Sequence, residues 1–474
     1  KKPLVANRVK SVSGIIETGL VRKGFAEAGH HTFKYDVAKL TKYKAEIVKF
    51  SIKSMEKMEA KLHRSLRIPA GYDYGSIIEK AIDVIIANPE WEYILGELLL
   101  DSRGHAIYEC LKKVFNPIAN KMARALVVAP PETALMSSRN NAYLFIAELY
   151  HGFIADIPTK IAKGKECYKN KLYHTLDTTT EKGLDDLYEN IWLERLYDEL
   201  DALALNPAHQ VTTPLEVDFS ASNMTMIGLL LNHTDYVDDS KYMWQVDGLS
   251  KLQVKTAQTP YVFGSSAPIK SLWAKNSLEY SAEQIDIMRQ EQTKGKFSIA
   301  NEFKDIIIKH CNPTALMNFH IADEKFQVEC NKTKNVGETT KSYVVLDSAT
   351  KKFRVIEHTS THKVPDLKQF VRYPVTGLIH NRDSWLLDFI FLGLKWGLPI
   401  HDAGIVTWSG ATTMRQRAVT GMKTINETRE ATVYNYLKSI NIDKAGLVKY
   451  AKLLSKIAKL NEGKTLRITP YLLK

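Results

Sequence analysis

PLEVDFSAS (214–222) and HDAGIV (401–406) each combine a short apolar run with one aspartate, Asp218 and Asp402 respectively. The apolar residues at 214–219 and 405–408 predict two strands. A carboxylate at the edge of an apolar strand is poorly solvated and needs a cation or a hydrogen-bond donor. If the strands are neighbours, the two carboxylates can hold a pair of magnesium ions, as in sites of phosphoryl transfer. Taken singly, each aspartate is more often a helix cap or a turn residue.

The segments around these two runs predict a mostly helical chain. Ser220–Asn223 offers capping residues for a helix over Met224–Leu231, and Ser384–Trp396 predicts another helix. Alternating β-branched residues over Lys325–Glu357 predict a hairpin or small ribbon, with turns at Gly337 and Asp347–Thr350. The fold class is therefore α/β with few strands and many helices.

Composition favours a polyanionic partner without deciding the matter. The chain has 474 residues, 65 Lys plus Arg against 53 Asp plus Glu, and a formal charge of +12. Lysines recur along a predicted amphipathic helix over Asp36–Ser65, whose basic face either is solvated or contacts a phosphate backbone. The apolar stretches fall far short of the roughly 20 residues of a membrane span, so no membrane partner is expected. The cysteines are too scattered for a zinc site or a disulfide framework.

Two lysines spaced by four residues mark a candidate nucleotide-binding helix. Lys251 and Lys255 lie on one helical face, and Phe263 and Gly264 follow on nearly the same face. Lysines can reach a triphosphate while the aromatic ring stacks near the sugar and base. Pro260 argues against an uninterrupted helix and predicts a kink. As an isolated pattern, two lysines on a helix are usually only solvated.

In chain order, these elements resemble motifs A, B and C of the single-subunit, phage-type RNA polymerases, which share a palm domain with A-family DNA polymerases. The matching residues are Asp218-Phe219-Ser220-Ala221-Ser222, Lys251-(x)3-Lys255-(x)7-Phe263-Gly264 and His401-Asp402. Further segments resemble family elements before motif A and before motif C, namely Asp101–Tyr108 with Phe115–Met122, and His380–Ser384.

The resemblance implies a role for each matching residue. Asp218, Asp402 and the main-chain carbonyl of Phe219 would bind two Mg²⁺ ions, and Lys255 would contact the phosphates and protonate the pyrophosphate leaving group. The remaining residues would contact the nucleotide (Lys251, Phe263, Gly264 and His380) or the template and hybrid (Arg103, Gly104 and His105).

Several matching positions depart from the family pattern. Lys251 and His105 stand where the family has arginine. Lysine at 251 keeps the charge but loses the bidentate hydrogen bonding of arginine. At His105, the contact that the family's arginine makes with a phosphate or sugar is in doubt. Phe263 replaces a tyrosine whose hydroxyl selects ribose. Ribose selection is then weakened or carried by His380, unless Phe263 only stacks and packs here.

The family's fold is a right-hand polymerase with palm, fingers and thumb around a small antiparallel palm sheet. We expect an N-terminal or thumb helical region over 1–90 and the first part of the palm over 91–230. The fingers, with the motif B helix and the ribbon, would cover 231–370, and the second part of the palm with C-terminal helices would cover 371–474. The ribbon could occupy the place of the family's promoter-reading hairpin, or be a plain structural hairpin.

The expected activity is DNA-directed RNA synthesis from NTPs on a DNA template, with an RNA product and pyrophosphate release. Because the region before Asp101 is short for the family, we expect an accessory protein, a second subunit or opened DNA at promoters. A phage enzyme in the cytoplasm of an infected bacterium is favoured over one in the mitochondrial matrix. The alternatives are an A-family-like DNA polymerase or primase, and a catalytically silent nucleic-acid-binding subunit.

Overall fold

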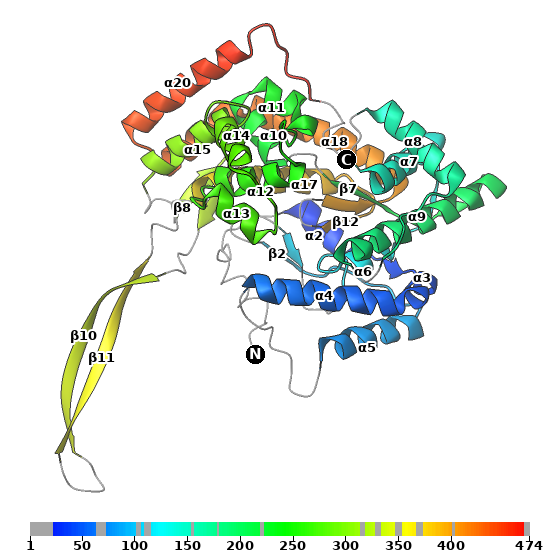
Figure 1. Ribbon diagram of the computed structural model, residues 1–474, viewed down its shortest axis with the longest axis horizontal. Coiled ribbons are helices and arrows are strands. Elements are labelled where there is room, and N and C mark those ends of the chain that lie inside the picture. The colour runs from blue at the N-terminus through cyan, green and yellow to red at the C-terminus, as the bar shows by residue number, and fades with distance from the viewer. Residues whose placement is uncertain are drawn as a thin grey trace.

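The computed structural model describes residues 22–62, 73–100, 106–108, 115–152, 156–177, 180–218, 222–312, 318–327, 333–346, 353–365, 373–400 and 403–468. These residues form a mostly helical body with small antiparallel sheets, and one long ribbon projects from it (Figure 1). The α/β expectation is confirmed at this level. No helix within the described ranges is long and apolar enough to span a membrane.

A three-stranded antiparallel sheet joins segments far apart in the sequence. Its strands are β12 (Gly397–Ile400), β13 (Ala403–Val406) and β7 (Leu215–Asp218), in that order. β12 and β13 are buried along their whole length, whereas β7 alternates buried and half-buried residues. The predicted strands at 214–219 and 405–408 therefore form and pair, although β13 starts earlier and ends at Val406.

The helices that flank β12 and β13 in the sequence fix this sheet in the core. α17 (Tyr373–Phe391) precedes β12, and α18 (Trp408–Glu427) follows β13. A Cβ atom at Gly404 would lie 2.8 Å from the ring of Phe391, so the close approach of α17 to β13 requires glycine. The buried Trp408 indole donates a hydrogen bond of 2.8 Å to the Thr213 carbonyl, two residues before β7.

The first half of the described chain supplies the helices α2 (Lys23–Gly29), α3 (Val37–Lys42), α4 (Lys44–Leu62), α5 (Tyr74–Ala87), α6 (Lys121–Ala125), α7 (Met136–His151), α8 (Ile157–Asn170) and α9 (Glu181–Leu205). Its short strands pair as β1 (Lys34–Tyr35) with β4 (Val127–Val128), β2 (Leu98–Leu100) with β3 (Ala106–Tyr108), and β5 (Glu132–Thr133) with β6 (Gln210–Val211).

The single helix expected over Asp36–Ser65 is instead two helices. Asp36 caps α3, and Tyr43 leaves the helical conformation between α3 and α4. Part of the basic face is also used within the fold, because Lys39 and Lys42 both bind Glu194 of α9 at 2.7 Å. The interpretation of this face as a phosphate-binding surface is correspondingly weakened.

The second half supplies α10 (Ser222–Leu231), α11 (Thr234–Asp238), the 3₁₀ turn η2 (Ser240–Tyr242), α12 (Lys251–Val262), α13 (Ile269–Lys275), α14 (Ala282–Thr293), α15 (Ser298–His310), α19 (Arg429–Ser439) and α20 (Lys444–Leu460). α17 begins at Tyr373 rather than at Ser384, because the buried residues Val375, Leu378 and Ile379 extend its apolar face. α12 passes through Pro260 and ends two residues later, so the proline does not interrupt it.

The predicted ribbon exists and is longer than expected. β8 (Asn318–Ile321) and β9 (Glu324–Gln327) form a hairpin at its base, and β10 (Thr333–Leu346) pairs with β11 (Phe353–Pro365). Figure 1 shows β10 and β11 projecting away from the helical body. Gly337 is not a turn: it lies within β10, beside a register shift. The turn expected at Asp347–Thr350 falls outside the described residues.

Candidate active site

The register of β7 and β13 brings two of the predicted motifs together. Asp218, the last residue of β7, lies opposite Ala403, the first residue of β13. Asp402 immediately precedes Ala403 in the sequence. Asp402 and Phe219 themselves lie outside the described residues. The pairing therefore places only their sequence neighbours, Ala403 and Asp218.

Asp218 shares its face of β7 with a second carboxylate that the sequence alone did not single out. Glu216 lies two residues before Asp218, and alternate residues of a strand point to the same side. Arg124 Nη1 and the Tyr188 hydroxyl each donate to the Glu216 carboxylate, at 2.7 and 2.6 Å. Glu216 is therefore held by its neighbours as a structural anion at the edge of the sheet.

A cavity of about 180 Å³ opens beside Asp218 and is lined by Asn141, Glu148, Glu216 and Arg415 among others. Burial lowers the pKa of the Arg415 guanidinium to about 10. Arg415 donates to Asn141 Oδ1, and Asn141 in turn donates 2.8 Å bonds to α18. An oriented arginine thus lines the same small cavity as Asp218.

The segment Phe115–Met122, which resembles family sequence, acts locally as a scaffold. Asn120 caps α6 by accepting from the amides of Met122 and Ala123, and its side chain donates to Ser51 at 2.7 Å. This cap fixes α6, from which Arg124 reaches Glu216. Long-range contacts of this kind leave no periodic signal in the sequence, so Arg124 and Arg415 were missed.

α12 presents the two predicted lysines. Ser250 and Gln253 form a capping box at its start, where each side chain bonds the other's backbone amide. Lys251 and Lys255 are both exposed, one turn apart on the helix. The predicted placement of two lysines on one face of a helix is therefore confirmed.

The end of α12 meets α17 at an aromatic contact. The Phe263 and His380 rings pack edge to face, with centroids 4.7 Å apart and an interplanar angle of 78°. Phe263 caps α12, and Gly264 follows with φ of +82°, a left-handed conformation that favours glycine. Two of the predicted nucleotide-binding residues, distant in sequence, are therefore in direct contact.

A buried ionic cluster anchors α17 just after His380. Glu324 of β9 accepts hydrogen bonds from Asn381 at 2.9 Å and Arg382 at 3.0 Å, and Nη1 and Nη2 of Arg22 also donate to it. Burial lowers the pKa of Arg382 to about 10. This cluster ties the base of the ribbon and the start of α2 to the helix that carries His380.

The residues expected to support the template, Arg103, Gly104 and His105, lie outside the described residues. The segment continues into β3, which pairs with β2. Tyr108 of β3 is buried, and its hydroxyl donates to the Phe25 carbonyl at 2.8 Å.

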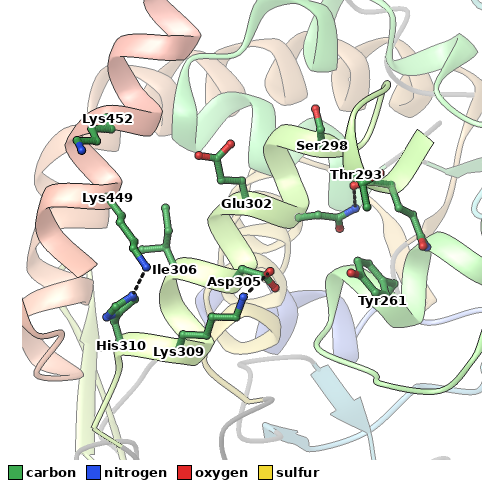
Figure 2. Close-up of a pocket in the computed structure, with 12 residues that line it drawn as sticks. Tyr261, Thr293, Ser298, Glu302, Asp305, Ile306, Lys309, His310, Lys449 and Lys452 are labelled. Atoms are coloured by element: carbon green, nitrogen blue, oxygen red, sulfur yellow. Dashed lines mark hydrogen bonds and ion pairs between the residues drawn. The ribbon is translucent and has the colours of Figure 1, made fainter. Parts of the chain in front are cut away.

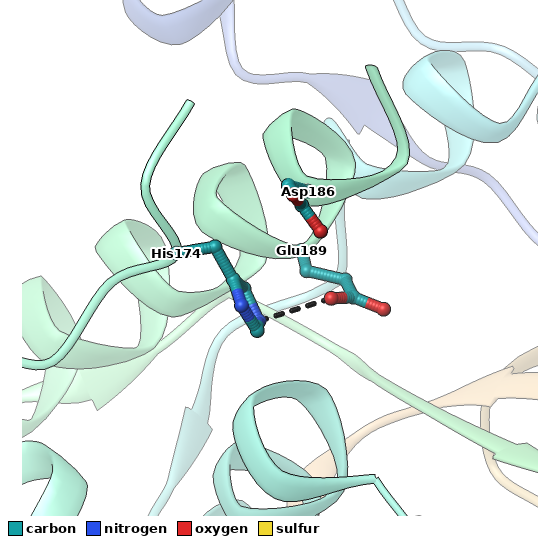
Figure 3. A group of neighbouring side chains, drawn as sticks. All are labelled: His174, Asp186 and Glu189. Atoms are coloured by element: carbon teal, nitrogen blue, oxygen red, sulfur yellow. Dashed lines mark ion pairs between the residues drawn. The ribbon is translucent and has the colours of Figure 1, made fainter. Parts of the chain in front are cut away.

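One group of three potential metal ligands occurs within the described part of the chain, and it is separate from the predicted set. His174, Asp186 and Glu189 have ligand atoms within 4.8 Å of one another (Figure 3). His174 Nε2 lies 3.0 Å from both the Glu189 carboxylate and the Leu149 carbonyl. An imidazole N–H shared between these oxygens accounts for the arrangement without an ion.

No protein-family model matches this sequence, and no curated protein is significantly similar to it. Within the described residues, Asp218 lies opposite the residue that follows Asp402, and Phe263 contacts His380.

Proposed function

We propose that the chain is a DNA-directed RNA polymerase that transfers nucleotides from NTPs to an RNA 3′ end. The observation that carries this proposal is the pairing of β7 with β13, which sets Asp218 opposite the residue after Asp402. Neighbouring strands are the arrangement in which two carboxylates can share a pair of metal ions. Phage transcription is the proposed setting.

Asp218, Asp402 and the Phe219 carbonyl would hold two Mg²⁺ ions. Their oxygen atoms are the ligands this ion prefers, and the antiparallel register sets Asp218 opposite Ala403, the residue after Asp402. When bound, such ions lower the pKa of an attacking hydroxyl and neutralise the charge of a triphosphate. The ribonucleotide 3′ oxygen forms a bond to the α-phosphorus while the bond to pyrophosphate breaks.

Lys251 and Lys255 are assigned to the triphosphate. Both residues are exposed on one face of α12, where their side chains can meet the phosphates of an incoming nucleotide. Lys255 would transfer a proton to the departing pyrophosphate oxygen, as a general acid does. Lys251 supplies charge without the planar fork of arginine.

Phe263 and His380 are assigned to the sugar. The imidazole is the polar member of this contact pair, since phenylalanine has no hydroxyl to offer the ribose 2′ position. A site that pairs a hydroxyl with a buried polar group discriminates strongly against its absence. His380 therefore carries ribose selection in this proposal, and selection is weaker than with a tyrosine at 263.

The palm is proposed to include β7, β12 and β13, since this sheet joins the segments 91–230 and 371–474. The helices from α12 to α15 would be the fingers, and the N-terminal helices would contribute to the thumb. An accessory protein or opened DNA is proposed for promoter entry. A purified chain that transcribes its linear duplex promoter unaided would contradict that last point.

A DNA polymerase or primase is the second candidate, because Phe263 lacks the hydroxyl expected of an RNA polymerase. Primer extension on an RNA–DNA scaffold with magnesium separates the two, with NTPs and dNTPs offered in separate reactions. Extension with NTPs supports the proposal, and extension with both supports weakened ribose selection. Extension with dNTPs alone favours the second candidate. No extension with either leaves a missing partner protein or a catalytically silent subunit as the explanation.

A further inference from the structure

α20 is exposed over most of its surface. This helix of 17 residues buries only Gly446, Leu453 and Ile457. Tyr450 lies on the same side and packs against Phe303 of α15, with ring centroids 6.1 Å apart. Figure 1 shows α20 at the edge of the molecule, next to α15.

A second apolar stripe runs along the exposed side of α20. It consists of Leu447, Ala451, Leu454 and Ala458, which are spaced as the a and d positions of a heptad repeat. Leu447 and Leu454 are 38% and 36% exposed, and Val448 beside them is 49% exposed. A single exposed leucine needs no explanation, but a stripe with this spacing is typical of a helix-packing surface.

Lysines follow the stripe along one edge, on the side of Val448, and α20 contains no acidic residue. Val448 and Ala451 line a shallow hollow together with Lys452, Lys456 and Lys459. Lys456 binds Glu302 of α15 at 2.8 Å. Within the part of the chain that the structure describes, neither Lys452 nor Lys459 forms an ion pair, so both are available to an external anion.

A groove lies between α15 and α20, on the far side of Lys452 from the stripe. Lys449 and Lys452 face a cavity of about 570 Å³ with Glu302, Asp305 and His310 (Figure 2). Both acids in this groove are already bound by lysines, Glu302 by Lys456 and Asp305 by Lys309 at 3.0 Å. The remaining charge along α20 is therefore positive.

We infer that the outer face of α20 is a docking surface for an acidic amphipathic helix of a partner protein. A partner helix would cover the stripe from Leu447 to Ala458 with its own apolar side and meet the lysines with glutamates or aspartates. This inference does not depend on the proposed polymerase reaction.

Other occupants fit the face less well. A second copy of α20 would bring two lysine rows together, and like charges repel. A nucleic acid would neutralise the lysines but leave the leucines in water. The stripe has no aromatic residue and contains alanines, unlike a membrane-surface helix. The chain after α20 turns toward α11, where Lys464 binds Asp235 at 2.8 Å.

The test uses the full chain and a synthetic, fluorescently labelled peptide with leucines at a and d and glutamates at the flanking positions. We expect saturable binding by anisotropy, and at least tenfold weaker binding to a peptide of the same composition with scrambled leucines. Leu447→Ser with Leu454→Ser should weaken binding at least tenfold, whereas Leu205→Ser, at an 89% exposed position of α9, should not change it.

Lys452→Glu with Lys459→Glu provides a second variant that leaves every buried residue of α20 in place, and it should also weaken binding at least tenfold. Absence of binding, equal binding of the scrambled peptide, or insensitivity to both pairs of substitutions would overturn the inference. The chain could instead bind anionic lipid vesicles or duplex DNA but not the peptide, and lose that binding with the leucine substitutions. This result would overturn the inference in favour of those ligands.

Discussion

Glu324 offers a quantitative test of how α17 is held. The side chains of Arg22, Arg382 and Glu324 are 2%, 6% and 15% exposed, and the two guanidinium groups share this one carboxylate. Glu324→Gln removes the charge while keeping the size of the side chain. Both arginines then remain buried beside a neutral amide. The NH₂ group of this amide is a donor and faces the guanidinium N–H groups, which are also donors.

Breaking a buried ion pair costs roughly 3–5 kcal/mol. Because glutamine keeps one acceptor oxygen, we expect the lower end, about 3 kcal/mol of the free energy of unfolding. Urea denaturation followed by tryptophan fluorescence measures this loss. Glu302→Gln is the matched control, since Glu302 and Lys456 are 41% and 51% exposed, and exposed pairs contribute below about 1 kcal/mol.

The reasoning would be refuted if Glu324→Gln lost no more stability than Glu302→Gln. Such a result would mean that Arg22 and Arg382 find other partners or water when the charge is removed. The cluster would then not be what fixes α17 beside Phe263.

Lys255→Ala is expected to slow NTP incorporation by roughly 10²- to 10⁴-fold, the range for a general acid, and Lys275→Ala on α13 is the control in the same single-turnover assay. Phe263→Tyr places a hydroxyl beside His380 and should raise the preference for NTPs over dNTPs at least about tenfold in competition assays; an unchanged preference would exclude the sugar assignment. Although burial opposes ionisation, hydrogen bonds from Lys39, Lys42 and Tyr43 lower the pKa of Glu194 from 4.5 to about 2. This stabilisation is present above the pKa of the unfolded state and is lost as the pH falls through the pKa of the folded state. The difference in free energy of unfolding between wild type and Glu194→Gln should therefore shrink from about pH 4.5 toward pH 2. A difference that stays constant over this range would refute the prediction.

The sequence predicted elements whose signal is local. The runs ending at Asp218 and starting near Ile405 form strands, and Lys251 and Lys255 share a helix face. Boundaries were less predictable, because tertiary packing sets them. α17 extends back to Tyr373 through buried residues, and Tyr43 splits the basic helix.

The supporting residues of the candidate site could not be predicted. Arg124, Arg415 and Glu324 act through contacts with residues remote in the sequence, and no periodicity or spacing marks such pairs. The contact between Phe263 and His380 is of the same kind. The resemblance to the polymerase family assigned both residues to the nucleotide but did not predict their contact.

The most direct test of the proposed function is RNA extension on a preassembled RNA–DNA scaffold with Asp218→Asn, Asp402→Asn and the double variant. Asp239→Asn, at an exposed position after α11, is the control. We predict that each single variant loses at least roughly 10²- to 10³-fold in rate with unchanged scaffold affinity, and that the double variant loses little more, because residues acting as one unit are not additive. Near-normal rates in either single variant, or losses that multiply in the double variant, would contradict a shared two-aspartate centre.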